Sequence, residues 1–534
     1  MIDETCEKIS APVQLLIQKL SERRTYRPAD IIQIIAACDI KEEDLLPWAD
    51  FDHPLQDSYG RKLVHKSPNF EIMVMSWKPG DISAIHDHGY TTWGAVQVFG
   101  PQEHAAFRVE DDQLFALNRT YFKYGQIVGV GHSLIHQMGN YSDKNVLTLH
   151  VYGLEEDVNM VTGEARLYLP ERGEIQLVNG GVFFNLPSHE VLETIAGPVG
   201  DYPTNLRNRV ESVNRALVAG SSSADVQPML DKILDAHSRG SLLQHIEQLV
   251  NDDHHANDSA RWNVLNHELK AAARLVSRES STSDSFHSYA EMYDHLICQP
   301  CLDQFITGYL DFVVDAFEPN WAAKKIFSLG CGTGLVEQHM MQRYSIPREN
   351  LYGIDFSASM VQEAQKRIHA DQGDILTLDP QLGKWDVAFS GLNVFQYIHS
   401  TQLEEAVRRT AEVLQDGGLF VGDFITPDHI RWYPNVMYSN DRQIISLRTP
   451  RLIEQEGKMY QESEIINIDF RSGHMHLNYA GKHKRYLAPL HRVRGYFEKY
   501  FSREVRLFDA LSLREISGDD DTCQSTRYIV VARK

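Results

Sequence analysis

The chain has 534 residues, roughly two to three times the size of one hydrophobic core, so a single compact module is excluded and two or three domains are expected. Hydrophobic residues make up 43% and charged residues 23% of the chain, which is typical of a globular protein and excludes a mainly disordered one. The formal charge of −21, from 73 acidic and 52 basic residues, repels phosphate backbones and anionic bilayers, so we expect neither nucleic acid nor a membrane as a partner.

Targeting and cysteine patterns indicate an intracellular protein. The chain holds no apolar run of about 18 residues, and acidic Asp3, Glu4 and Glu7 stand where a secretory signal would be basic. Six cysteines are too few for a disulfide framework, and the C-x-x-C pair Cys298 and Cys301 has no second pair to complete a zinc site. We therefore expect a cytoplasmic protein in which this pair has a structural role.

The first part of the chain predicts helices followed by a β-rich domain. Up to about residue 50, apolar residues recur with the period of a helix after Pro12. Strand-like runs then follow, separated by turn-forming residues, over 70–75, 95–99, 121–124 and 146–152. Many short strands without intervening helices predict a β-sandwich or barrel up to about residue 187.

The period changes twice more along the chain. From about Ser188 to Ser283 apolar residues recur with helical spacing, and polar stretches interrupt them, one of which carries His254 and His255 as an expected solvated pair. Beyond Phe286 helices and apolar strands alternate, which predicts a parallel sheet covered on both faces. The predicted domains are therefore a β domain over 1–190, a helical connector over 191–283 and an α/β domain over 284–534.

Histidines on the predicted strands form a candidate metal site. His86 and His88 are two residues apart, so their imidazoles project from the same face of a strand. A closed barrel can bring a distant strand beside the first, and it offers His136 or His132 as a third ligand. His136 is favoured because apolar residues precede it, whereas His132 follows a glycine in a turn. Three unrelated surface histidines remain the alternative.

A second polar face lies on the strand 146–153. Thr148, His150 and Tyr152 share one face of this strand, and apolar residues share the other. Buried polar groups need hydrogen-bond partners, which a metal site with bound substrate would supply. A satisfied network in a closed core would give the same pattern.

The stretch from Tyr59 to about Pro187 resembles the cysteine dioxygenase family of thiol dioxygenases. The matching pieces, in the family's order and near its spacing, are YGR at 59–61, SWKPG leading into IHDHG, H-x-x-x-N at 136–140 and TLHVY at 148–152. The resemblance implies a cupin β-barrel in which His86, His88 and His136 ligate ferrous iron. Three imidazoles would leave positions for a cysteine-like amino-thiolate and O₂, and the product would be a sulfinate.

The same resemblance assigns three further residues. It implies that Arg61 pairs with the substrate carboxylate, and that His150 and Tyr152 form an outer hydrogen-bonded shell. Animal members of the family carry a cysteine that is cross-linked to the tyrosine matching Tyr152. Trp93 is the aligned residue here, so we expect no cross-link.

A glycine loop opens the predicted α/β domain. Gly330, Gly332 and Gly334 follow an apolar strand and precede a helix that begins near Leu335, where the backbone can approach a ligand. Asp355 ends the next strand, where a carboxylate can accept both ribose hydroxyls. A dinucleotide site is the competing interpretation. Its motif is G-x-G-x-x-G, whereas this loop reads G-x-G-x-G.

The span from about Tyr289 to Lys534 resembles the class I S-adenosylmethionine-dependent methyltransferases. The resemblance rests on the glycine loop and Asp355, and on YAEMYD at 289–294, QGDI at 372–375, VLQDGGLFVGDF at 413–424 and the closing YIVVARK. It implies that the loop glycines and Asp355 bind S-adenosylmethionine. Asp374 and Ile375 would contact the adenine, and Asn393 and Phe395 would lie near the methionine portion.

Two features of this region stay open. Ser328 stands where the family most often has an acidic residue near the cofactor's amino group, so another group must replace it, or the domain is a Rossmann-like fold that does not bind the cofactor. The segment from Thr426 to Leu487 is the least family-like part and is predicted to cover the acceptor pocket. His399 or Tyr293 could serve as a base for a neutral acceptor, whereas an anionic acceptor needs none.

Two functions remain. The first is a bifunctional enzyme that oxidises a small thiol at a three-histidine iron and transfers a methyl group from S-adenosylmethionine to the same or a related metabolite. Linking two active sites raises the local concentration of an intermediate. The second is a methyltransferase with a non-catalytic cupin domain that binds or senses a ligand. The sequence does not predict an oligomeric state.

Overall fold

The computed structural model describes residues 9–517 and 526–534, except for 56, 158–159, 253–259, 277–283, 285, 288, 298 and 381–382. It divides into two compact units, residues 1–249 with 263–272, and residues 250–262 with 273–534. His254, His255 and Cys298 lie outside the described residues. Within the part that is described, no helix is both long and apolar enough to cross a membrane.

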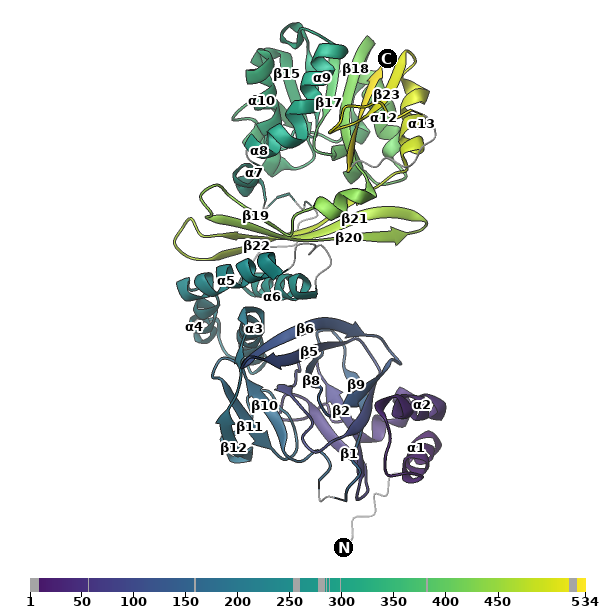
Figure 1. The fold of residues 1–534 in the computed structure, drawn as a ribbon, viewed down its shortest axis with the longest axis vertical. Helices are drawn as coiled ribbons and strands as arrows, with labels where there is room; N and C mark the ends of the chain where they lie inside the picture. Colours follow the sequence, from purple (N-terminus) through teal and green to yellow (C-terminus); the bar gives the residue numbers. More distant parts are fainter. Residues whose placement is uncertain are drawn as a thin grey trace. The chain divides into compact units, whose positions relative to one another are not determined.

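The first unit begins with two helices that pack on a β-barrel (Figure 1). The helices are α1 (Ala11–Ser21) and α2 (Pro28–Cys38). The strands are β1 (Gly60–Lys66), β2 (Phe70–Trp77), β3 (Ile85–His86), β4 (Trp93–Val98), β5 (Gln102–Glu110), β6 (Gln113–Phe122), β7 (Ile127–Gly131), β8 (Ile135–Gly139), β9 (Val146–Gly153), β10 (Ala165–Leu169), β11 (Glu174–Val178), β12 (Val191–Ala196) and β13 (Val199–Gly200).

These strands form two sheets that enclose one interior. The orders are β1-β2-β9-β4-β7 and β12-β11-β10-β3-β8-β5-β6-β13. One buried cluster takes side chains from both sheets, among them Met73 of β2, Val96 of β4, Phe122 of β6 and Met138 of β8. The predicted β-barrel with N-terminal helices is therefore confirmed.

The strands continue further than the periodicity predicted. β12 and β13 lie at 191–200, where helical spacing was expected, and the first connector helix begins only at Tyr202. β12 is largely exposed because it pairs along one edge with β11, and such an edge strand lacks a buried apolar stripe that sequence could reveal.

Four helices follow the barrel, as expected for the connector. They are α3 (Tyr202–Val218), α4 (Ser223–Ile233), α5 (Ala236–Asp252) and α6 (Ala260–Val276). Asp201 caps α3, because its carboxylate accepts a hydrogen bond from the backbone N–H of Thr204 at 3.0 Å. The cap fixes the point at which the chain changes from strand to helix.

A buried ion network joins the connector helices to the barrel. Arg207 of α3 lies 2.8 Å from Glu103 of β5, 3.0 Å from Glu211 and 3.6 Å from Glu268 of α6. Arg119 of β6 contacts both Glu103 and Glu268. All five side chains are almost fully buried. Burial acts against ionisation of Glu103, yet the positive charge of Arg207 and its other neighbours lower the pKa of that carboxyl strongly.

We expect Arg207→Leu to lower the free energy of unfolding by about 3–5 kcal/mol, because it leaves buried carboxylates without a countercharge. Urea denaturation followed by circular dichroism measures this loss. Exposed Arg172→Leu is the control, and it should change the free energy of unfolding by less than about 0.5 kcal/mol. Equal stabilities of the two variants would contradict a structural role for the network.

The second unit contains a seven-stranded sheet in the order β16-β15-β14-β17-β18-β24-β23. Its strands are β14 (Ile326–Leu329), β15 (Leu351–Asp355), β16 (His369–Gln372), β17 (Trp385–Ser390), β18 (Leu414–Ile425), β23 (Glu504–Asp509) and β24 (Arg527–Arg533). β14 to β18 are parallel, and β24 runs antiparallel to β18 and β23. The predicted parallel sheet is therefore present, and antiparallel β24 lies beside its last parallel strand.

Helices cover both faces of this sheet (Figure 1). They are α8 (Gln299–Leu302), α9 (Gly308–Ala316), α10 (Leu335–Tyr344), α11 (Ala358–Ala364), α12 (Leu403–Val413) and α13 (Leu490–Tyr500). A further helix, α7 (Ala290–Leu296), packs instead against Ile444 and Ile465. α12 and α13 pack on the face that carries Phe327, and α9 to α11 on the face that carries Ile326. α11 ends at Ala364, and strand β16 begins at His369.

A second sheet is inserted between β18 and α13. It consists of β19 (Val436–Tyr438), β20 (Ile444–Gln455), β21 (Lys458–Asp469) and β22 (His476–Tyr486), which pair in chain order as antiparallel neighbours. It coincides with the predicted insertion, 426–487. The fold is thus multidomain, with an all-β cupin barrel, a helical connector and an α/β Rossmann-like domain.

Candidate functional site

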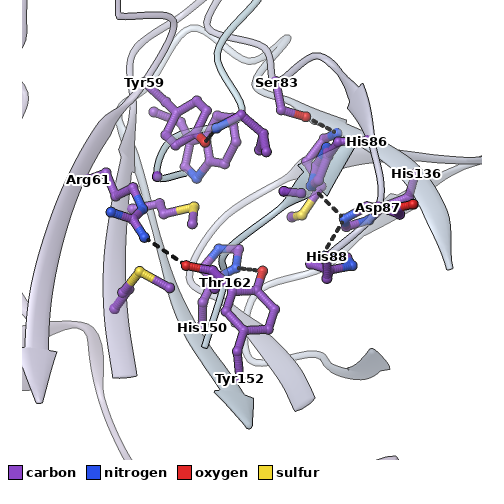
Figure 2. A pocket seen from close by; sticks show the side chains of 17 residues that line it. Tyr59, Arg61, Ser83, His86, Asp87, His88, His136, His150, Tyr152 and Thr162 are labelled. Atoms are coloured by element: carbon purple, nitrogen blue, oxygen red, sulfur yellow. Dashed lines mark hydrogen bonds between the residues drawn. The ribbon is translucent and has the colours of Figure 1, made fainter. Parts of the chain in front are cut away.

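The structure brings His86, His88 and His136 together inside the barrel (Figure 2). His86 on β3 pairs directly with His136 on β8, and His88 follows two residues after His86. Nε2 of His136 lies 3.1 Å from Nε2 of both His86 and His88. All three side chains are buried, so they are not unrelated surface histidines.

The environment of the three imidazoles keeps them neutral. Burial lowers the pKa of His86 to about 4. Burial and then the neighbouring imidazoles lower the pKa values of His88 and His136 well below the usual range. Nδ1 of His86 donates to the carbonyl of Ala84 at 2.9 Å, so its Nε2 lone pair faces the cluster. Neutral imidazoles are the form that binds a metal ion.

Converging nitrogens of this kind fit a first-row transition metal. A separation of 3.1 Å suits neighbouring ligands, since metal–nitrogen bonds are about 2.1 Å long. His104 was not among the predicted site residues. Its Nε2 lies 3.0 Å from Nδ1 of His136, and this contact would hold the His136 ring in place. The alternative third ligand, His132, is exposed and contacts the carbonyl of Thr91 instead.

A chain of hydrogen bonds runs along the polar face of β9. The indole N–H of Trp77 donates to Thr148 Oγ1 at 2.9 Å, Thr148 lies 2.7 Å from Nε2 of His150, and Nδ1 of His150 lies 2.7 Å from the hydroxyl of Tyr152. Burial lowers the pKa of His150 to about 3, so the imidazole is neutral. If Thr148 donates to His150, and His150 to Tyr152, every member is satisfied and the proton of Tyr152 is left to face the pocket.

Arg61 lies across the pocket from the three histidines (Figure 2). Its Nη2 donates to Thr162 Oγ1 at 3.3 Å. Among the described residues, no carboxylate forms an ion pair with this guanidinium. Arg61 is therefore placed to bind an anionic group of a small molecule in the same pocket.

The neighbour of Tyr152 on β4 is Gly94, which corrects the alignment that gave Trp93. The strand register pairs Gly94 with Tyr152, and it pairs Trp93 with Gly153. Trp93 therefore projects from the other face of β4, where its ring contacts Tyr26. A shift of one residue reverses the face of a strand. Glycine also has no thiol, so the position opposite Tyr152 cannot form the cross-link.

The second unit holds a cavity of about 1190 Å³ at the carboxyl ends of its parallel strands. The volume exceeds the usual range for one small ligand, about 300–1000 Å³. Gly330 and Gly332 line the cavity, and Gly334 precedes α10. All three glycines have positive φ angles, and a Cβ atom at Gly330 would lie 2.4 Å from Val394. The loop therefore requires glycine for its conformation.

Asp355 lies at the end of β15, beside this loop. Its carboxylate accepts hydrogen bonds of 2.9 Å from the backbone N–H groups of Gly332 and Ser357. Burial raises the pKa of Asp355 above its usual range, against these hydrogen bonds. The carboxylate of Asp355, which is predicted to bind the ribose, is thus held in a fixed position at the cavity wall.

The other predicted cofactor contacts fall into two groups. Asp374, Ile375 and Asn393 line the cavity, and Oδ1 of Asn393 is buried without a hydrogen-bond partner. An unpaired buried acceptor fits a cavity that takes a polar ligand. Phe395 does not line it. Its ring packs against Phe420 in the core below the sheet, so its expected place near the methionine portion is wrong.

Glu337 places a carboxylate directly beside Ser328. Ser328 Oγ donates to Oε1 of Glu337 at 2.6 Å, and Oε2 of Glu337 is buried without a partner. Glu337 lies in the first turn of α10 and lines the cavity. Burial raises its pKa to about 7. Residue spacing does not reveal Glu337 as a site residue, because its contact with Ser328 spans a loop.

The segment from Thr426 to Leu487 also lines this cavity. His429, Tyr433, Met437, Arg448 and Arg485 belong to it. His399 and Tyr293, the two candidate bases, also line the cavity. The segments predicted to bind the cofactor and the segment predicted to cover the acceptor pocket therefore line one cavity.

Comparison with known proteins identifies two families. Residues 1–154 match the family model described as cysteine dioxygenase type I, and residues 326–418 match a methyltransferase domain model. Both resemblances drawn from the motifs are confirmed by these matches. The chain thus joins a cysteine dioxygenase-like region to a methyltransferase domain.

Solved structures similar to part of the chain include methyltransferases. A S-adenosylmethionine-dependent methyltransferase from Clostridium acetobutylicum is 15% identical with a TM-score of 0.37, and the match covers 46% of this chain and 98% of that one. CcbJ from Streptomyces caelestis is 15% identical with a TM-score of 0.35, covering 48% and 99%. DesVI from Streptomyces venezuelae is 17% identical with a TM-score of 0.34, covering 47% and 99%.

Proposed function

We propose that the protein is a bifunctional enzyme. Its first unit oxidises a small, cysteine-like thiol to a sulfinate at a three-histidine ferrous site. Its second unit transfers a methyl group from S-adenosylmethionine to the same or a related small metabolite. The observation that carries the proposal is the convergence of three buried, neutral imidazoles opposite Arg61, in a chain that also holds a glycine-loop cavity.

In the first unit, the residues of the chain bind and orient the thiol. Arg61 would pair with its carboxylate, and Tyr152 would donate a hydrogen bond toward the reacting sulfur. Ferrous iron held by His86, His88 and His136 would supply the activation of O₂. The thiolate gives up four electrons and gains both oxygen atoms, so the balance RS⁻ + O₂ → RSO₂⁻ needs no further reductant.

In the second unit, the chain contributes positioning and exclusion of water. The loop glycines and Asp355 would hold the nucleoside, and Asp374 and Ile375 would contact the base. S-adenosylmethionine supplies a methyl group on a positively charged sulfur, which is already a good leaving group. An anionic acceptor attacks without a base, whereas a neutral acceptor would use His399 or Tyr293.

The decisive experiment follows both half-reactions in the whole protein. The protein is loaded anaerobically with iron(II), mixed with cysteine, 3-mercaptopropionate or cysteamine, and exposed to O₂ in an oxygen electrode. Mass spectrometry then analyses the products formed with S-adenosylmethionine under air. We expect oxygen uptake with at least one thiol and a methylated product. No uptake with any of the three thiols would favour the cupin domain as a binding or sensing module.

Glu337 gives a separate prediction for the cofactor site. We infer that its carboxylate binds the ammonium group of the cofactor, and we expect Glu337→Gln to weaken S-adenosylhomocysteine binding by about tenfold or more. Because burial raises the pKa of Glu337 to about 7, the carboxylate ionises as the pH rises. Affinity should therefore increase between pH 6 and 8 in the native protein.

Calorimetry at several pH values measures this effect. The pH dependence should be much smaller in Glu337→Gln. Exposed Glu349→Gln, in the turn before β15, is the control and should bind like the native protein. An identical pH profile in Glu337→Gln and native protein would refute the role of Glu337.

A further inference from the structure

The charges that line the methyltransferase cavity come from two sources. The carboxylates lie on segments outside the inserted sheet, and they are Asp284, Glu337, Asp355, Asp374 and Asp509. The inserted sheet contributes guanidinium groups instead, Arg448 from β20 and Arg485 from β22. The cofactor carries positive sulfur and ammonium groups, which suit the carboxylates. The guanidinium groups call for a different ligand.

Both arginines are buried against neutral partners. Arg448 is 7% exposed and donates to the hydroxyl of Tyr289 at 2.8 Å. Arg485 is 8% exposed and donates from Nε to the hydroxyl of Tyr397 at 3.1 Å. Nη1 of Arg485 is buried without a hydrogen-bond partner. The two guanidinium groups also flank one ring, at 5.6 and 5.5 Å from the centre of Tyr433.

No carboxylate among the described residues forms an ion pair with Arg448 or Arg485. Arg527, which also lines the cavity, is different because it pairs with buried Asp423. A buried charge without a countercharge is unfavourable unless a ligand supplies one. The wall formed by the inserted sheet is therefore positively charged.

The positive charges of Arg448 and Arg485 also change the pKa of Tyr433, which lies between them. Burial alone would raise the pKa of this phenol, yet the charges of Arg448 and Arg485 lower it to about 8. The hydroxyl groups around the two arginines thus partly compensate their charge. They leave the unpaired Nη1 of Arg485 available as a donor to a ligand in the cavity.

We propose that Arg448 and Arg485 bind an oxyanion of the methyl acceptor, so that the acceptor is a small carboxylate or sulfinate. This inference rests on the proposed methyltransferase function of the second unit. Guanidinium groups donate two parallel hydrogen bonds to such planar or forked anions. They would hold the acceptor by its charged end, leaving its nucleophilic atom directed toward the methyl group.

The test measures binding of a defined anion. Cysteine sulfinate, which carries both a carboxylate and a sulfinate, is titrated by calorimetry into the full-length protein saturated with S-adenosylhomocysteine. Cysteamine is the probe without an oxyanion. We expect cysteine sulfinate to bind, Arg448→Met and Arg485→Met each to weaken it by about tenfold or more, and cysteamine to bind much more weakly.

Three controls separate this site from others. Arg451 lies on β20 and pairs with Glu462, and more than half of its side chain is exposed. Arg451→Met should therefore leave cysteine sulfinate binding unchanged. Arg61→Met removes the anion-binding group of the first unit, so binding that persists in this variant belongs to the second unit. S-adenosylhomocysteine affinity, measured on each variant, shows that the fold is intact.

The possible outcomes separate a failure of the acceptor site from a failure of the proposed methyltransferase function. If the native protein does not bind S-adenosylhomocysteine, the proposed methyltransferase function itself is overturned. Normal cofactor binding without cysteine sulfinate binding, or with equal binding in native protein and Arg485→Met, would overturn the inference alone. Equal weakening of S-adenosylhomocysteine and cysteine sulfinate would assign the arginines to the carboxylate of the cofactor, and would also overturn it.

Discussion

His136→Ala is expected to abolish iron binding and oxygen uptake by the first unit. The variant removes one of three nitrogens that converge within 4.8 Å, and it leaves a cavity instead of a ligand. Removing even an outer partner of a ligand costs about 10–100-fold in metal affinity, so the loss of a ligand should exceed 100-fold. Iron retained per chain after anaerobic loading and desalting measures the effect directly.

His132→Ala is the matched control, because His132 is an exposed histidine in the turn before the same strand. It should retain the iron content of the native protein. His104→Ala should lie between the two, about 10–100-fold weaker in affinity, because it removes only the group that orients His136. Native iron content in His136→Ala would refute the three-histidine site.

Asp355→Asn is expected to weaken S-adenosylhomocysteine binding by about 100-fold or more. The carboxylate would lose charged hydrogen bonds to the ribose, each of which contributes about 1.5–3 kcal/mol. The variant also replaces an acceptor of the Gly332 and Ser357 N–H groups by an amide that can accept only through one oxygen. The glycine loop is therefore less well held.

Calorimetry measures the binding, and oxygen uptake by the first unit serves as the internal reference. Exposed Asp416→Asn, at the start of β18, should bind like the native protein. If Asp355→Asn keeps the native affinity while its oxygen uptake is also normal, the ribose assignment is wrong and the cavity holds the cofactor differently.

The elements of the fold were predictable where their periodicity is local. His86 and His88 share a face because a strand has a period of two, and Gly330 to Gly334 follow an apolar strand directly. β12 was missed because an exposed edge strand has no apolar stripe. The Trp93 alignment was one residue out because sequence alone does not give the register of β4 against β9.

The partners of the site residues were harder to predict. His104 reaches His136 only because β5 and β8 are neighbours in the closed barrel, although 32 positions separate them. Glu337 compensates for Ser328 through a contact between a strand end and the first turn of a helix. Phe395 is five residues past the end of β17, but its side chain turns into the core instead of the cavity. Such contacts depend on tertiary packing and leave no spacing in the chain.

The inserted sheet has a consequence for how this protein could change over time. Its strands, 436–486, enter the chain between β18 and α13 as one contiguous stretch, and they carry the two guanidinium groups that we propose bind the methyl acceptor. The residues predicted to contact the nucleoside all lie in other segments. Substitutions within this one stretch of about fifty residues could therefore change which methyl acceptor is bound. The residues predicted to bind S-adenosylmethionine would be unaffected.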